Sequence, residues 1–88
     1  MNIKKGFKLR KVAREYFIVS EGIQNIDFSK LISLNESSAH IWQNMEGKEF
    51  TVDDMAKCLT DEYEVDYDTA LADSKSLAEK WMEIGVIE

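Results

Sequence analysis

The first twenty residues alternate between apolar and polar positions in a way that predicts a β-hairpin. Phe7-Lys8-Leu9 alternates, and the run from Tyr16 to Val19 is aromatic and β-branched. The stretch from Val12 to Glu15 between them suits a turn, so we expect strands over about residues 6–12 and 15–20. The segment from Glu21 to Asn25 contains glycine and asparagine and is typical of a loop.

A third strand is predicted over about residues 27–34, with one mostly apolar face and one mostly polar face. The apolar parity holds Phe28, Ile32 and Leu34, and the other parity holds Ser29, Leu31 and Ser33. Lys30 falls on the apolar parity, which indicates that part of this strand lies near the edge of a sheet.

Helical spacing of the apolar residues replaces alternation after residue 35. Asn35 is a suitable N-cap, and we expect the first helix to end near Glu46, before Gly47. Thr51-Val52-Asp53-Asp54 is an acidic variant of a capping box and predicts a second helix over about residues 52–63.

Asp66 is the expected cap of a third, longer helix, and Gly85 is its expected end. After Gly85, we expect Val86 and Ile87 to pack back on the body of the protein. The apolar stripe of this helix comprises Tyr67, Ala70, Leu71, Ser74, Leu77, Ala78 and Trp81.

Three short strands followed by three helices predict an α+β fold in a single domain that spans residues 1–88. None of the helices buries its stripe alone, so they are expected to pack on each other and on one face of the sheet. Only Glu64 and Val65 separate the second helix from the third, a spacing that suits a helix-turn-helix pair.

Charge is divided unevenly along the chain, whose formal net charge is −6. Residues 1–14 contain six basic side chains and no acidic ones, whereas the rest holds five basic and all seventeen acidic ones. Nucleic-acid binders gain affinity by neutralising phosphates, so an acidic body disfavours that class of partner. The basic segment suits either a solvated strand face or a surface for an acidic partner.

The apolar runs are too short to cross a membrane. Lys4 and Lys5 are not followed by the apolar core of a secretory signal. We therefore expect a cytoplasmic protein that binds neither membrane nor nucleic acid.

No set of side chains has the spacing of an active site or a metal centre. His40 lies off the apolar stripe of its helix, without a motif to orient it, and is expected at the surface. Cys58 has only Lys57 as a basic neighbour, which favours a structural or surface thiol over a catalytic one. Acid pairs such as Asp53-Asp54 fit helix N-termini better than a calcium loop. We predict that the protein is not an enzyme and holds no metal and no cofactor.

An exposed strand edge is the remaining candidate for function. Such an edge offers unpaired N–H and C=O groups that another peptide completes by adding a strand. The chain has no proline, so every strand residue keeps its N–H donor. A third strand beside the long third helix would present this backbone edge next to an apolar wall.

The stretch Leu34-Asn35-Glu36-Ser37-Ser38-Ala39-His40-Ile41-Trp42 resembles the signature of the PqqD family. The run from Thr51 to Asp66 and the segment from Ala72 to Ile87, with its closing Gly-Val-Ile, are similar to the second half of that family. The similarity covers nearly the whole chain in the same order. It implies a winged-helix-like body of three N-terminal strands and three helices, in a peptide chaperone.

The resemblance implies that the leader region of a ribosomally made precursor peptide adds antiparallel to the third strand. The module would then present the peptide to a modifying enzyme, often a radical SAM protein. Carried onto this chain, the strand is Phe28, Ser29, Lys30, Leu31, Ile32 and Ser33, and the helix wall is Asp73, Ser74, Leu77, Lys80 and Trp81. Ser74 departs from the family, which usually has an apolar residue there.

Two other functions stay open at this stage. A winged-helix DNA binder would place the third helix in the major groove, but that helix carries more acidic than basic side chains. A regulatory or protein-interaction subunit without a leader peptide is the other. A homodimer that pairs the same strand edge is also compatible with the sequence.

Overall fold

The computed structural model describes residues 1–20 and 32–88. Its first two strands, β1 (Phe7–Val12) and β2 (Glu15–Ser20), form the predicted antiparallel hairpin. The turn between them is only two residues long, and Ala13 has a φ of 58° there. A positive φ suits so short a turn because it follows the twist of the two strands, although alanine adopts it less readily than glycine.

The third strand, β3 (Ile32–Leu34), pairs antiparallel with β2, which gives the sheet the order β1-β2-β3. The predicted alternation is present, since Leu34 is buried, Ile32 is half-buried and Ser33 is exposed. The rest of the predicted strand, residues 27–31, and the predicted loop at 21–25 lie outside the described residues. β3 therefore has β2 on one side and is an edge of the described sheet.

The helices are α1 (Glu36–Met45), α2 (Val52–Glu62) and α3 (Tyr67–Ile84). Each begins at its predicted cap, and the Thr51 capping box is formed. Gly85 ends α3 with a φ of 93°, the left-handed conformation that favours glycine. The predicted α+β arrangement, three antiparallel strands followed by three helices, is confirmed.

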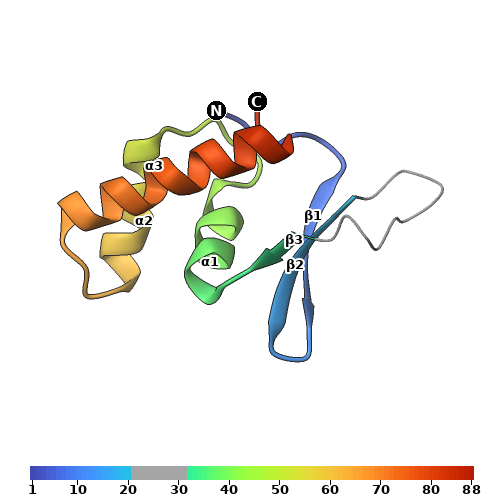
Figure 1. Ribbon diagram of the computed structural model, residues 1–88, viewed down its shortest axis with the longest axis horizontal. Helices are drawn as coiled ribbons and strands as arrows, with labels where there is room; N and C mark the ends of the chain where they lie inside the picture. The colour runs from blue at the N-terminus through green and yellow to red at the C-terminus, as the bar shows by residue number, and fades with distance from the viewer. Residues whose placement is uncertain (21–31) are drawn as a thin grey trace.

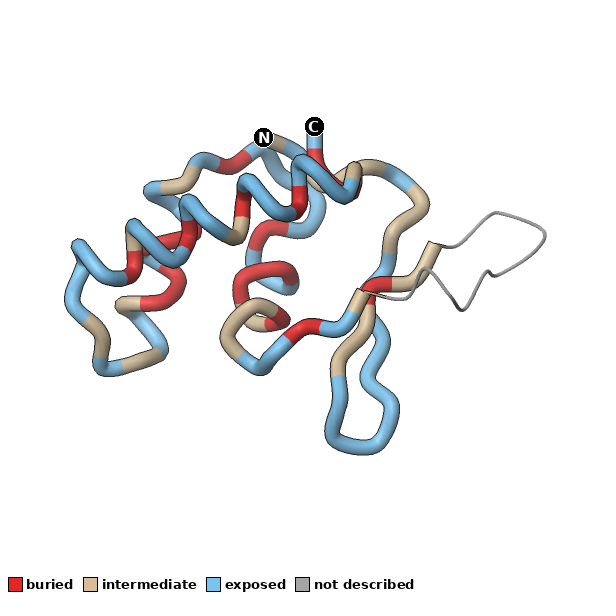
Figure 2. Tube along the Cα trace, in the orientation of Figure 1, coloured by how far each residue is buried: buried red, intermediate tan, exposed pale blue. Residues whose placement is uncertain are grey.

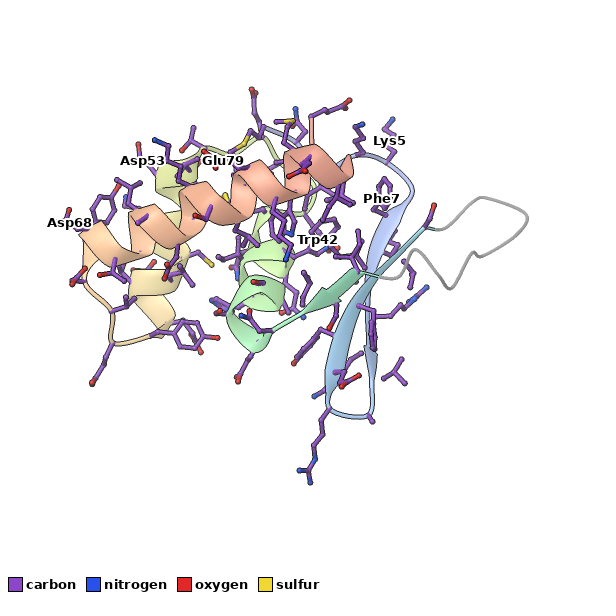
Figure 3. All side chains as sticks on the ribbon, viewed as in Figure 1. Lys5, Phe7, Trp42, Asp53, Asp68 and Glu79 are labelled. Atoms are coloured by element: carbon purple, nitrogen blue, oxygen red, sulfur yellow. The ribbon has the colours of Figure 1, made fainter. Side chains whose placement is uncertain are left out.

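The core lies between the three helices and the inner face of the sheet. Trp42 of α1 and Trp81 of α3 meet edge to face at its centre, with ring centroids 5.3 Å apart. Figure 3 shows Trp42 in the space between α1 and α3. Buried positions concentrate in α1 and on the inner sides of α2 and α3, whereas the far end of the hairpin is exposed (Figure 2).

The two ends of the chain pair with each other. Asn2 and Glu88 exchange backbone hydrogen bonds of 2.8 Å, and the N–H of Lys4 donates to the carbonyl of Val86. Val86 and Ile87 are buried, as predicted. Figure 1 shows both termini above α1, away from β3. Neither tail therefore covers the outer edge of β3.

Candidate functional site

The outer edge of β3 is the first part of the candidate site. Within residues 1–20 and 32–88, β2 is the one strand that pairs with β3. The N–H and C=O groups of a strand alternate in direction, so half of those in β3 point away from β2. An edge of this kind is a template for a further strand.

A small pocket adjoins this edge. Its volume is about 110 Å³, and it lies between β3 and the C-terminal half of α3. Ile32 and Leu34 contribute the strand side, and Leu77, Lys80 and Ile84 contribute the helix side. Leu77, Lys80 and Ile84 follow one another at helical spacing, so they form one stripe along α3. A strand added to β3 would lie with one face over this stripe.

A larger pocket of about 440 Å³ continues from the small one. It lies among α1, the end of α2 and the middle of α3. Asn35, Ser38, Leu77 and Lys80 line both pockets, which together form one groove. We call this the β3–α3 groove.

The predicted site residues divide into three groups in the structure. Ile32 and Ser33 lie on the edge strand, and Asp73, Leu77 and Lys80 line the groove from α3. Phe28, Ser29, Lys30 and Leu31 lie outside the described residues. The third group, Ser74 and Trp81, is buried.

Ser74 is 0% exposed and Trp81 is 1% exposed. The sequence predicts both as part of the peptide-binding wall, but in the structure both belong to the core face of α3. Trp81 reaches the groove only as the floor of the small pocket, and Ser74 lines neither pocket. The Oγ of Ser74 and the Nε1 of Trp81 have no hydrogen-bond partner among the residues that the structure describes. A direct contact between Ser74 and a docked peptide would need α3 to move.

The charges along the groove are few and mixed. Lys80 is an exposed cation beside both pockets, and Asp73 is an exposed anion beside the larger one. Partial burial, followed by the carboxylates of Glu36 and Glu62, raises the pKa of the Tyr63 phenol. The groove therefore favours an apolar occupant with a few polar contacts.

The sequence of this chain matches the model of a known protein family. The model of coenzyme PQQ synthesis protein D (PqqD) matches residues 10–87. The chain belongs to the PqqD family. The match extends from β1 to the last buried residue after α3, so it includes both sides of the β3–α3 groove. A search of the curated proteins finds no match.

A solved structure shares the fold of this PqqD-family chain. It is described as TbiB1 in complex with the TbiA(beta) leader peptide. The two chains are 18% identical, with a TM-score of 0.74, over 100% of this chain and 95% of the other. At that identity, the likeness establishes the arrangement of strands and helices.

Sequence reasoning missed several residues of the groove in this PqqD-family protein. Ile84, which is 42% exposed, lines the small pocket beside Lys80. It lies four residues after Lys80, so helical spacing alone indicates that the two share a face. The walls formed by Ile41, Leu59 and Tyr63 carry no such signal, because they depend on how three helices meet.

His40 and Cys58 lie outside the groove. Cys58 is buried, and desolvation, followed by the nearby charge of Asp61, raises the pKa of its thiol. A thiol of this kind is a poor nucleophile at neutral pH. His40, expected at the surface, is half-buried and packs edge to face against Tyr63 at 6.0 Å. The packing of α1 against the end of α2 therefore accounts for the position of His40.

Residues 1–20 and 32–88 contain neither a cluster of metal-ligating side chains nor a membrane-spanning helix. No group of three or more His, Cys, Asp or Glu side chains is placed to hold a metal ion there. No helix of these residues has the length and apolar character needed to cross a membrane.

Proposed function

We propose that the protein is a non-catalytic peptide-binding module. It binds the leader region of a ribosomally made precursor peptide and presents that peptide to a modifying enzyme, such as a radical SAM protein. The observation that carries the proposal is the open edge of β3 beside an apolar groove. Membership of the PqqD family and the fold shared with a leader-bound protein support the same function.

The docked peptide adds a fourth strand to the sheet, antiparallel to β3. Each main-chain hydrogen bond contributes about 1 kcal/mol net, and each buried apolar anchor contributes about 1.5–3 kcal/mol. Association and ordering cost about 4–15 kcal/mol. A segment with a few of each therefore binds in about the micromolar range, which suits a module that hands its peptide on.

The register of the sheet determines which side chains of the peptide face inward. Leu9, Ile18 and Ile32 form one inward row across the strands, and Tyr16 and Leu34 belong to the next. Ser33 lies between these rows and is exposed. A docked strand continues both rows, so its side chains opposite Ile32 and Leu34 are apolar and the one between them faces solvent.

This function requires the protein to meet the peptide where ribosomes make it. We therefore infer a cytoplasmic location. Lys80 lies beside the groove and is available to pair with an acidic residue of the leader.

The function is tested with candidate leader peptides, taken from short open reading frames near the gene of this protein. Leu77→Asp places a charge in the groove wall and is expected to reduce affinity by at least about thirtyfold, since it removes one apolar anchor. Leu71→Asp is the matched control, because Leu71 is also half-buried on α3 but lines neither pocket.

Fluorescence anisotropy measures the affinity, and circular dichroism checks that both variants are folded. Leu77→Ala serves as the milder variant if the aspartate destabilises the domain. Equal binding by the wild type and both Leu77 variants would contradict a docking site in this groove.

A further inference from the structure

The larger pocket of the β3–α3 groove lies beyond the end of β3. Its apolar walls come from three helices: Ile41 of α1, Leu59 at the end of α2 and Leu77 of α3. Ile41 and Leu59 are buried, so they form the floor, whereas Leu77 is half-buried. Tyr63 and Val65, which follow α2, are also half-buried and close the far side.

The pocket has room for a large side chain. Its volume of about 440 Å³ falls within the range of small-ligand pockets, about 300–1,000 Å³. The polar side chains around it, Ser37, Ser76, Asp73 and Lys80, are held at its rim by their exposed or half-exposed positions. An apolar floor with a polar rim is the arrangement that surrounds an anchor residue in peptide interfaces.

The pocket joins the strand edge near Leu34. Asn35, the cap of α1 that directly follows Leu34, and Ser38 in the first turn of α1 line both pockets. The larger pocket is therefore continuous with the Leu34 end of β3. A strand that runs antiparallel to β3 begins at the Leu34 end and finishes at the Ile32 end. Residues that reach the larger pocket must consequently precede the strand-forming segment of the docked peptide.

We propose that this pocket takes one large apolar side chain, aliphatic or aromatic, from the N-terminal flank of the docked segment. This inference rests on the proposed function, including its antiparallel strand, and adds to it a second recognition element. The anchor lies within about four residues of the paired segment, a span of about 13 Å in an extended chain. The peptide thus carries an apolar anchor first, and then the alternating apolar pair that faces Ile32 and Leu34.

The test selects binders from a display library of random 16-residue peptides. The selection is run on the wild type and on Ser76→Trp, in which an indole on the rim occupies the pocket. Lys75→Trp is the matched control, because Lys75 is the exposed neighbour of Ser76 on α3 and lines neither pocket of the groove. Leu77→Asp measures the background of the selection.

The wild type and Lys75→Trp are expected to enrich the alternating apolar pair together with an upstream apolar residue. Ser76→Trp is expected to keep the pair and lose the upstream preference. Individual wild-type binders should lose at least about tenfold in affinity when the upstream residue is changed to serine, and the same change should cost less than about twofold in Ser76→Trp.

The possible failures are distinguishable. An alternating pair without any upstream preference, or with the apolar anchor downstream, overturns this inference and leaves the proposed function intact. An upstream preference that survives in Ser76→Trp also overturns it. No enrichment above the Leu77→Asp background overturns the proposed function, and this inference with it.

Discussion

The two edges of the described sheet differ in length, charge and surroundings. β1 forms one edge with six residues, and its sequence contains Lys8, Arg10 and Lys11. β3 forms the other edge with three described residues and no charge among them. A helix stands beside β3, with pockets between the two, whereas the turn next to β1 is exposed and Val12 is 61% exposed.

This difference shows which edge is suited to receive another chain. Cations on an edge strand disfavour pairing, because an added strand must approach them and bury part of their hydration. The described part of β3, Ile32–Leu34, carries no cation and offers apolar surface at the same time. The sequence alone assigns no role to the basic side chains of residues 1–14. Three of them, Lys8, Arg10 and Lys11, lie on β1, the edge that disfavours pairing.

The basic and acidic side chains, which are separated along the sequence, are also separated in space. Figure 3 shows Lys5 at the start of the hairpin, and Asp53, Asp68 and Glu79 on α2 and α3. An acidic α3 disfavours docking on nucleic acid, since a helix in the major groove must neutralise phosphates. The β3 edge lies between these two charged regions.

The largest effect is expected from placing a charge at each edge in turn. Ile32 and Leu9 are both half-buried and flank Ile18 in the same inward row, one on each edge strand. Ile32→Asp is expected to weaken peptide binding by at least about thirtyfold, because it puts a carboxylate where an apolar side chain docks. Leu9→Asp is expected to change affinity by less than about twofold.

Isothermal titration calorimetry with the precursor peptide measures both affinities. Thermal unfolding of the two variants gives the control, since both lose an apolar contact with Ile18 and are expected to be destabilised alike. A larger loss of affinity in Leu9→Asp would assign the peptide to the β1 edge.

A smaller effect is expected when the β1 edge loses its charges. Lys8→Val with Lys11→Val makes β1 a better pairing strand, and we expect self-association to strengthen by about tenfold. The estimate follows from about 0.2–1 kcal/mol for each like-charge pair that a β1–β1 contact no longer has to accommodate. Sedimentation velocity measures the association.

Lys57→Val with Lys75→Val is the control, because it removes the same charge from exposed positions on α2 and α3. If the helix variant associates as strongly as the strand variant, net charge rather than the β1 edge controls self-association.

The smallest effect concerns the buried side of α3, which faces the core. Ser74→Ala removes a buried hydroxyl that has no hydrogen-bond partner, and we expect it to stabilise the domain by about 1 kcal/mol. For a domain of this size that is a rise in melting temperature of about 4–8 °C. Differential scanning calorimetry measures it.

Ser76→Ala is the control at an exposed position of the same helix, where little change is expected. Peptide affinity should be unaffected by Ser74→Ala, since its side chain lines neither pocket. A loss of affinity would show that Ser74 acts in binding after all.

The helices were predictable because each helix end is determined by side chains only a few residues away in the sequence. The side chains of Asn35 and Asp66 accept hydrogen bonds from the N–H groups of Ser38 and Thr69, three residues further along the chain. Gly85 stops α3 by its own conformation. Signals of this kind need no information about the rest of the fold. The hairpin was predictable for a similar reason, since its strands are neighbours in the chain.

The groove was only partly predictable. Asp73, Leu77 and Lys80 lie on one stripe of α3, whereas Ser74 and Trp81 lie on the adjacent stripe, which is buried. Helical spacing places these stripes side by side but does not say which one faces the core. That depends on how α3 packs against Trp42, a contact between residues 39 positions apart. The larger pocket depends on three helices at once and has no sequence signal of its own.

Amide hydrogen exchange, followed residue by residue by NMR with and without the bound precursor peptide, tests the central claim most directly. A peptide that adds a strand to β3 slows exchange within Ile32–Leu34 and leaves Phe7–Val12 unchanged. Slower exchange within Phe7–Val12, or in the helices with β3 unchanged, would contradict docking at the β3 edge.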